Sequence, residues 1–394
     1  MTYESPTPLG QPCAVATGRK GLAIGLPKCD DPTERRFPLT PEGAAQLIER
    51  GYRVVMEEGA ASAIHYADLS YRRAGVETGP RGEALCADIV IYPSALPASD
   101  VRRMRRGAML LTLSEAACRD TRSLAELLSR HIIAVALDLV EDKHGQTPFA
   151  DILAEIDGRA AIAIASSLLA DAVHGKGILL GGISGIIPCE TLIIGSGIAA
   201  EAAALSAMGL GSTVKMFDND VYSLRRAVQN LGPWLITSSL HPRTLGNALR
   251  SADIVVATPT QSRFSLGAED VASMKKGVLT FDLTPCSDGS AFPSMVPVDL
   301  ALASALESSA RIEGRVCFTH AGSAVARTAA MAMSNTLLAF METIVDAEAP
   351  RGALKMHPGM QKATLTFLGK PVHPRVAELL RIRPIDLTIY LSLS

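Results

Sequence analysis

One glycine loop has residue types and spacing that point clearly to chemistry. It reads Gly195-Ser196-Gly197-Ile198-Ala199-Ala200, directly after an apolar strand expected at 191–194 and at the start of an expected helix. Gly195 permits a tight turn, Gly197 lets the backbone approach a pyrophosphate, and Ala200 keeps the helix close to the strand. The N-terminus of the helix then faces the phosphates. The motif in this context predicts a bound dinucleotide.

A carboxylate after the next expected strand, 213–217, indicates which dinucleotide is bound. Asp218 lies 23 residues beyond Gly195, at the end of that strand. A carboxylate at this point accepts the ribose hydroxyls and disfavours a 2′-phosphate, so NAD is predicted rather than NADP. Asp220 could be the acceptor instead, and Arg225 or Arg226 could still neutralise a phosphate.

Short apolar strands alternate with helices on both sides of this loop. Strands are expected at 21–26, 52–56, 87–91 and 108–113, a helix begins after the N-cap Thr40, and a long helix covers 151–173. The second half repeats the pattern from 191 to 257, and a further long helix is expected at 321–345. Such alternation predicts an α/β fold with parallel sheets covered on both faces. A chain of 394 residues is too long for one ordinary core, so two domains are expected.

Composition excludes several classes of partner. Lys and Arg (38) nearly balance Asp and Glu (40), so no field for nucleic acid or an anionic membrane surface is expected. No apolar run approaches the roughly 20 residues that cross a bilayer, and the first twenty residues lack the pattern of a secretory signal. The seven cysteines are scattered, and no His, Cys and carboxylate cluster has metal-ligand spacing. A cytoplasmic protein with reduced thiols and no catalytic metal is predicted.

Four segments between 21 and 341 resemble the alanine dehydrogenase and nicotinamide nucleotide transhydrogenase family. They are IGLPKCDDPTERRFPLTPEGAAQLIERGYRVVMEEGA, AEIDGRAA, GKGILLGGISGIIP and LIIGSGIAAEAAALSAMGLGSTVKMFDND. The last two are the most specific, because that glycine-rich lead-in is not general to Rossmann domains. The resemblance implies two Rossmann-like domains, with an NAD-binding domain at 151–319 inserted into a discontinuous substrate domain at 1–150 and 320–394. It also implies a site between the domains and a homo-oligomer.

The resemblance assigns roles to four residues of the substrate site. Arg36, within ERRF, falls on the arginine that binds the substrate carboxylate, a task suited to its planar fork. Ser94 stands where the family has a substrate-binding lysine, and Glu115 stands where alanine dehydrogenases have a catalytic histidine. His320 falls on an asparagine near the nicotinamide.

These departures change the expected chemistry. Oxidising an amine or reducing an imine needs a group that moves a proton near neutral pH, which histidine does unaided and glutamate does only when burial raises its pKa. Glu115 or His320 is therefore expected to move the proton. Alternatively, Glu115 accepts a substrate ammonium while Ser94 serves as a neutral hydrogen-bonding group.

Further positions follow from the resemblance near the cofactor. Thr258 and Pro259 are expected to contact it from a loop shorter than the family's. The family's acidic residue after the 278–282 strand is not cleanly placed, because Cys286 holds the direct position and Asp288 comes two positions late. Asp138 matches an acidic position seen in the family and is either structural or site-lining.

The resemblance and the departures together favour an NAD(H)-dependent oxidoreductase that acts on an amino acid, an imine or a 2-oxo acid. Its substrate or reaction is expected to differ from that of alanine dehydrogenase, as in opine-type, saccharopine-type or hidden-redox enzymes. The alternative is a catalytically silent NAD-binding or sensing protein. The segment 350–394 does not follow the family closely and is expected to serve assembly or a lid.

Overall fold

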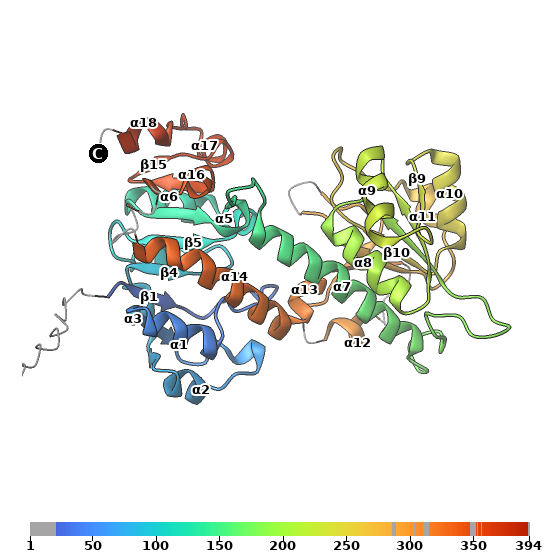
Figure 1. Cartoon of the computed structure of the whole chain (residues 1–394), viewed down its shortest axis with the longest axis horizontal. Helices are drawn as coiled ribbons and strands as arrows, with labels where there is room; N and C mark the ends of the chain where they lie inside the picture. The colour runs from blue at the N-terminus through green and yellow to red at the C-terminus, as the bar shows by residue number, and fades with distance from the viewer. Residues whose placement is uncertain are drawn as a thin grey trace, which may run out of the picture.

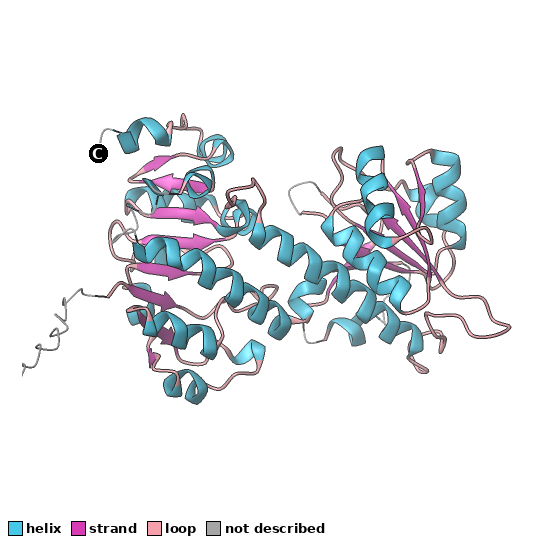
Figure 2. Ribbon diagram, viewed as in Figure 1, coloured by secondary structure: helices cyan, strands magenta, loops and turns pink. Residues whose placement is uncertain are grey.

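The structure is a computed structural model that describes residues 21–285, 289–302, 304–309, 315–346, 352, 354, 355 and 357–392. Two sheets, each covered by helices on both faces, lie at opposite ends of the molecule (Figures 1 and 2). Two long helices run between them. Within the described residues, no helix combines the length and the apolar character that crossing a membrane requires.

The first sheet has eight strands in the order β15-β14-β6-β5-β4-β1-β2-β3. They are β1 (Ala23–Leu26), β2 (Arg53–Glu57), β3 (Glu77–Gly79), β4 (Ile89–Ile91), β5 (Met109–Thr112), β6 (Ile133–Ala136), β14 (Thr364–Phe367) and β15 (Lys370–Pro371). The six N-terminal strands are parallel, whereas β14 pairs antiparallel with β6 and with β15. The C-terminal segment, expected to serve assembly or a lid, thus extends this sheet.

Helices and short 3-10 turns cover the first sheet. They are α1 (Pro41–Glu49), η1 (Ser62–Ile64), α2 (Asp68–Arg73), α3 (Arg81–Leu85), α4 (Ala98–Val101), α5 (Ser114–Ala117), α6 (Thr121–Ser129), η2 (Leu137–Leu139), α16 (Pro358–Lys362), α17 (Pro374–Leu380) and α18 (Leu387–Ser392). The hydroxyl of Thr40 accepts the backbone N–H of Gly43 at 3.2 Å, so the N-cap expected for α1 is present. Pro41, which lacks an N–H, occupies the first helical position.

The second sheet is entirely parallel and has seven strands in the order β12-β13-β11-β10-β7-β8-β9. Its elements are β7 (Glu190–Ile194), α8 (Ile198–Gly209), β8 (Thr213–Phe217), α9 (Val221–Leu231), β9 (Ile236–Ser238), α10 (Pro242–Ser251), β10 (Ile254–Ala257), α11 (Ala268–Ser273), β11 (Leu279–Asp282), β12 (Val296–Asp299), α12 (Ala305–Ser309) and β13 (Val316–Thr319). The chain runs outward in opposite directions from β7 and β10. Ligands of open α/β sheets bind at the carboxyl ends of strands at such a switch point.

Helix α7 (Pro148–Ala170) leads into the second sheet, and α14 (Ala326–Asp346) returns to the first (Figure 1). The helix expected at 321–345 is interrupted, because Val325 (φ −103°, ψ 41°) separates α13 (Ala321–Ala324) from α14. Helix α7 packs closely along α8, and a Cβ on Gly158 would lie 2.2 Å from the carbonyl oxygen of Ala199. The inter-domain helix is therefore pressed against the helix that follows the glycine loop.

Candidate active site

The first glycine of the loop occupies a position that other residues cannot adopt without strain. Gly195 follows β7 with φ +100°, and a Cβ there would lie 2.1 Å from Oγ1 of Thr258. The backbone N–H and the hydroxyl of Thr258 both donate to the carbonyl of Ile194, at 2.8 and 2.9 Å, which holds Thr258 in this place. Pro259 also lies against the loop, since its carbonyl oxygen would be 3.0 Å from the same Cβ. The structure thus brings Thr258 and Pro259 to the glycine loop.

The second glycine faces open space at the N-terminus of α8. Gly197 is the N-cap residue of this helix, and a Cβ placed on it would meet no atom within 4 Å. Ile198 is 44% exposed, whereas Ala199 and Ala200 are buried against the domain core. A tight turn with no room for a side chain, followed by an open helix N-terminus, fits a bound pyrophosphate. The residues present therefore suit the predicted dinucleotide.

Asp218 is tied directly to the glycine loop. It follows β8 and is buried, and its Oδ2 accepts the hydroxyl of Ser196 at 2.6 Å. Asp220, the other candidate for the ribose, caps α9 by accepting the backbone N–H groups of Tyr222 and Ser223 at 3.0 and 3.2 Å. Its second oxygen accepts Gln261 at 2.8 Å. Of the two carboxylates, Asp218 is the one positioned by the loop itself.

The acidic position after β11 falls on a stretch that is only partly described. Cys286 and Asp288, the two residues considered for it, lie outside the described residues. Asp282, at the end of β11, accepts the backbone N–H groups of Thr284 at 3.0 Å and Ala291 at 2.9 Å. This carboxylate therefore anchors the chain on both sides of that stretch.

Arg36 is held by a carboxylate two residues earlier. Its Nε donates to Oε1 of Glu34 at 2.8 Å, its Nη2 donates to Oε2, and its backbone N–H also donates to Oε1 at 2.9 Å. The side chain of Arg36 is only 15% exposed, and that of Glu34 is 8% exposed. Burial alone would lower the pKa of Arg36, but the charge and hydrogen bonds of Glu34, with the charges of Asp157 and Asp138, raise it overall. The guanidinium is therefore fixed and charged, with its Nη1 side turned away from Glu34.

Asp157 lies on α7 beside the start of α13. Its Oδ1 accepts the backbone N–H of Gly322 at 2.8 Å, and a Cβ on Gly322 would lie 2.1 Å from the same oxygen. Burial raises the pKa of Asp157, while the nearby charges of Arg36 and His320 oppose the rise. The next residue, Gly158, lies against the first turn of α8.

His320 directly follows β13 and lies beside a carboxylate from the neighbouring strand. Asp299 ends β12, where it is in register with Thr319, and its Oδ2 lies 3.0 Å from Nδ1 of His320. The contact departs from ideal hydrogen-bond direction. The backbone N–H of Ala301 fixes the other oxygen of Asp299 at 2.9 Å. His320 has φ 55°, a left-handed conformation that is strained for a residue with a side chain and is often found at functional sites.

Two residues, Ser94 and Glu115, stand at positions where the family has a lysine and a histidine. Ser94 is buried, and its hydroxyl donates to Oδ2 of Asp31 at 2.7 Å. Burial alone would raise the pKa of Asp31, but hydrogen bonds from Thr33 and Ser94 lower it overall. Glu115 belongs to α5, and its side chain lies outside the described part of the chain.

Asp138 supports the start of α5. Its two carboxylate oxygens accept the backbone N–H of Ser114, at 2.8 Å, and the hydroxyl of the same residue. Asp138 therefore has a structural role at the helix that carries Glu115, and its charge also acts on Arg36.

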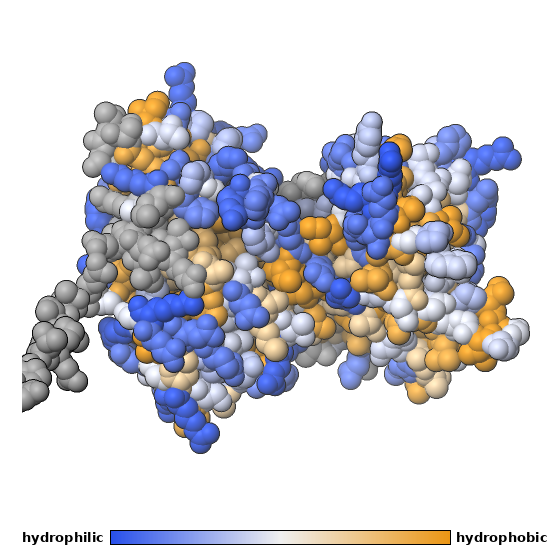
Figure 3. Space-filling model, viewed as in Figure 1, coloured by the Kyte–Doolittle hydropathy of each residue, from blue (hydrophilic) through white to orange (hydrophobic). Residues whose placement is uncertain are grey.

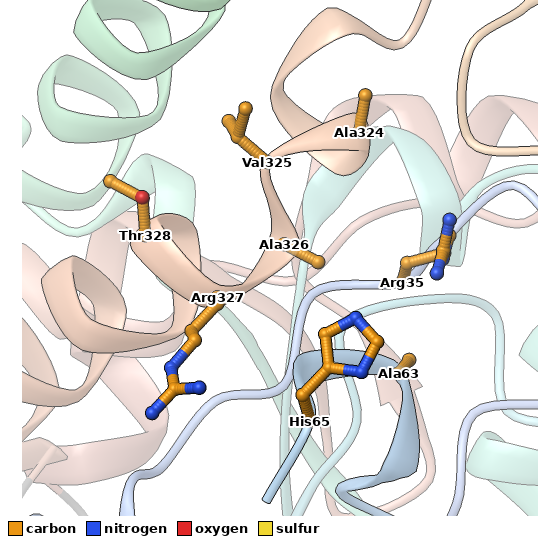
Figure 4. A pocket seen from close by; sticks show the side chains of 8 residues that line it. All are labelled: Arg35, Ala63, His65, Ala324, Val325, Ala326, Arg327 and Thr328. Carbon is orange, nitrogen blue, oxygen red and sulfur yellow. The ribbon is translucent and has the colours of Figure 1, made fainter.

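A pocket of about 220 Å³ opens beside this group of residues, at the start of α14 (Figure 4). It is lined by Arg35, Ala63, His65, Ala324, Val325, Ala326, Arg327 and Thr328. Figure 4 shows the side chain of Arg327 extending away from His65, and its guanidinium lies 4.5 Å from the ring centre of Tyr66. Arg35 donates to the carbonyl of Ala301 at 3.3 Å, so it links the two domains. Of the predicted catalytic residues, His320 has a described side chain, and it does not line this pocket.

Three carboxylates of the site were missed by sequence reasoning. Glu34 lies two residues before Arg36, and the sequence alone does not show that its carboxylate pairs with the guanidinium of that arginine. Asp157 had a visible signal, since it is a charge within the apolar helix that leads to the glycine loop. Asp299 could have been found only with strand order, which places it next to the residue before His320.

Comparison with known proteins identifies the family. The model of the C-terminal domain of alanine dehydrogenase/PNT matches residues 161–374, and that of the N-terminal domain matches residues 25–156. Alanine dehydrogenase of Mycolicibacterium smegmatis is 26% identical over 369 residues, which cover 91% of this chain and 96% of that protein.

Two solved structures share the fold. An L-alanine dehydrogenase superposes with a TM-score of 0.78 at 22% identity, covering 91% of this chain and 99% of its own. A transhydrogenase from Sinorhizobium meliloti superposes with a TM-score of 0.71 at 20% identity, covering 89% of this chain and 99% of its own. These findings confirm the predicted resemblance, the two-domain α/β fold and NAD as the cofactor. The chain belongs to the alanine dehydrogenase/PNT family.

Proposed function

We propose that the chain is an NAD(H)-dependent oxidoreductase that interconverts an amino acid with its imine or 2-oxo acid. The observation that carries this proposal is the convergence of Arg36, Asp157 and His320. They come from the loop after β1, from α7 and from the end of β13. Asp157 accepts the backbone N–H of Gly322, two residues after His320, its charge acts on Arg36, and the helix that carries it packs along α8. A cation, a carboxyl and an imidazole next to a dinucleotide site suit a small zwitterionic substrate.

The proposed role of Arg36 is to bind the substrate carboxylate. Glu34 engages the Nε and Nη2 side of the guanidinium, which leaves the edge formed by Nη1 and the second hydrogen of Nη2 for a substrate. A planar fork held in one orientation binds a carboxylate with less loss of side-chain entropy than a mobile one. Glu34 is therefore a positioning residue. The hydroxyl of Ser94 already donates to Asp31, so Ser94 can offer a substrate only an acceptor.

The proposed role of His320 is proton transfer. The carboxylate of Asp299 lies at Nδ1 and orients the ring, so Nε2 is the atom that we assign to the transfer. The cofactor, once bound on the glycine loop, supplies or accepts the hydride. Glu115 is the other candidate for the proton, because Asp138 anchors the helix on which it lies.

The test is turnover measured at the absorbance band of reduced nicotinamide. The purified chain is assayed with NAD and a panel of amino acids, and with NADH, 2-oxo acids and amines. A general acid or base contributes about 10²- to 10⁴-fold, so His320→Gln should lower kcat by that factor. His144→Gln, in an exposed loop, is the matched control. Saturable NADH binding without turnover on any substrate would instead favour the silent NAD-binding alternative.

The homo-oligomer implied by the resemblance has a candidate surface. Residues 171–189 form an arm that projects from the second domain (Figure 1), and its tip is apolar in Figure 3. Ile187 is 90% exposed and Leu179 is 67% exposed. We propose that this arm contributes to self-association, which sedimentation of an Ile187→Glu variant beside the wild type would test.

A further inference from the structure

The hydroxyl of Ser196 joins the glycine loop to the carboxylate that follows β8. It donates to Oδ2 of Asp218 at 2.6 Å, a distance typical of a hydroxyl bonded to a carboxylate, and such bonds are roughly twice as strong as those between neutral groups. Ser196 is 1% exposed and Asp218 is 5% exposed, so little water competes for this bond. A buried side chain of the loop therefore acts directly on the carboxylate predicted to bind the ribose.

The loop does not need this hydroxyl to keep its place. The backbone N–H of Gly195 donates to the carbonyl of Phe217, so the backbone already ties the loop to the end of β8 at 2.8 Å. Ser196 does not lie in the left-handed region, and its backbone conformation therefore suits alanine as well as serine. The hydroxyl can thus be removed without removing the support of the loop, and what changes is the hold on Asp218.

Two donors on different oxygens fix the orientation of the Asp218 carboxylate. Ser196 donates to Oδ2, and the backbone N–H of Asp220 donates to Oδ1 at 3.1 Å. A carboxylate has about four lone-pair positions, so each oxygen keeps one for a hydroxyl of the ribose. A carboxylate fixed in this orientation cannot turn away from a 2′-phosphate, which brings about −1.5 to −2 charges of its own.

We propose that Ser196 is a positioning residue that holds Asp218 toward the ribose and thereby sets the preference for NAD over NADP. With the hydroxyl in place, the 2′-hydroxyl of NAD meets an acceptor that is already oriented, and the 2′-phosphate of NADP meets a fixed negative charge. Without it, the carboxylate can rotate, which weakens the first interaction and relieves the second. The inference concerns the cofactor and does not depend on the substrate proposed above.

The ratio of the Kd values for NADPH and NADH measures this preference. The two dinucleotides differ only in the 2′-phosphate, so effects on the pyrophosphate and any loss of folded protein cancel in the ratio. Fluorescence titration of the wild type should show tighter binding of NADH. A hydrogen bond to a charged group corresponds to about ten- to hundred-fold in binding, and Ser196→Ala should lower the ratio by up to that factor.

Ser212→Ala is the matched control. Ser212 is also buried in the second domain, and its hydroxyl donates to the carbonyl of Cys189 at 2.8 Å, beyond the end of β7 that is opposite to the glycine loop. This variant loses a buried hydroxyl and should keep the wild-type ratio. In an Asp218→Ala background, where the carboxylate is absent, adding Ser196→Ala should leave the ratio unchanged.

The outcomes are distinct. A lowered ratio in Ser196→Ala that disappears in the Asp218→Ala background would support the inference. A wild type with no preference for NADH, or a Ser196→Ala variant with the wild-type ratio, would overturn it. An equal effect of Ser196→Ala with and without Asp218 would also overturn it, because the hydroxyl would then act by another route. All of these are binding measurements, so a failure of the proposed oxidoreductase activity would be seen separately.

Discussion

The two glycines of the dinucleotide loop should respond differently to the same substitution. Gly195→Ala places a methyl group 2.1 Å from Oγ1 of Thr258 at a backbone φ of +100°. The backbone strain costs about 1–3 kcal/mol, and forcing a methyl group into a filled space costs about 1–3 kcal/mol more. We therefore expect the second domain to lose about 2–6 kcal/mol of stability.

Gly197→Ala is the matched comparison. Its φ is −82°, its ψ is −170°, and the added methyl group would meet no atom within 4 Å, so only the change at the helix N-cap matters, at about 1 kcal/mol or less. The methyl group would instead occupy the space through which a pyrophosphate approaches. We expect near-normal stability and a Kd for NADH raised about tenfold or more, which corresponds to about 1.4 kcal/mol.

Amide hydrogen exchange of β7 and β10, followed by mass spectrometry, measures the stability of this domain, and fluorescence titration measures NADH binding. Adding Thr258→Ala to Gly195→Ala removes the nearest clashing atom, so the pair should show a favourable coupling of about 1–3 kcal/mol. If Gly195→Ala were as stable as Gly197→Ala, the steric account of the loop would be wrong.

Three further changes test the substrate side of the site. Burial raises the pKa of Asp157 in the folded state. The wild type should therefore lose stability as the pH rises from the pKa of the unfolded state, about 3.9, through the raised pKa of the folded state. In urea unfolding at a series of pH values, Asp157→Asn should show a flatter pH profile and a higher stability at neutral pH. Glu34→Gln should cost about 3 kcal/mol, measured by urea unfolding, because it leaves the mostly buried Arg36 without its ion pair; an unchanged midpoint would argue against this. Gly322→Ala should lower kcat while the Kd for NADH stays constant, because its methyl group would collide with Asp157; a matching loss of NADH affinity would point to general misfolding.

The cofactor half of the site was largely predictable from the sequence. The glycine loop has a local mechanism, and its neighbours Ser196 and Asp218 lie at a fixed spacing in one βαβ unit. Strand and helix periodicity likewise located β7, β8 and β10, because buried parallel strands are continuous apolar runs.

The substrate half depends on contacts between distant segments. The meeting of Asp157 with Gly322, and of Asp299 with His320, follows from helix docking and strand order, which local patterns do not encode. The antiparallel β14 was also missed, although it forms a local hairpin with β15 through a turn that contains Gly369. Its pairing with β6, by contrast, joins segments far apart in the sequence. The break at Val325 was also missed. The nearest glycine, Gly322, lies inside α13 and not at the break, so it does not mark where the helix stops.

Transfer of a labelled hydride tests directly whether the chain oxidises an amino acid with NAD. The chain is incubated with NAD and an amino acid that carries deuterium on its α carbon, and the reduced nicotinamide is analysed by mass spectrometry. An oxidoreductase acting beside the glycine loop should deliver one deuterium to the nicotinamide. The Gly197→Ala variant should not transfer deuterium at low NAD concentrations, because its dinucleotide affinity is reduced. Saturable NAD binding with no deuterium in the nicotinamide for any amino acid of the panel would contradict the proposed oxidoreductase activity.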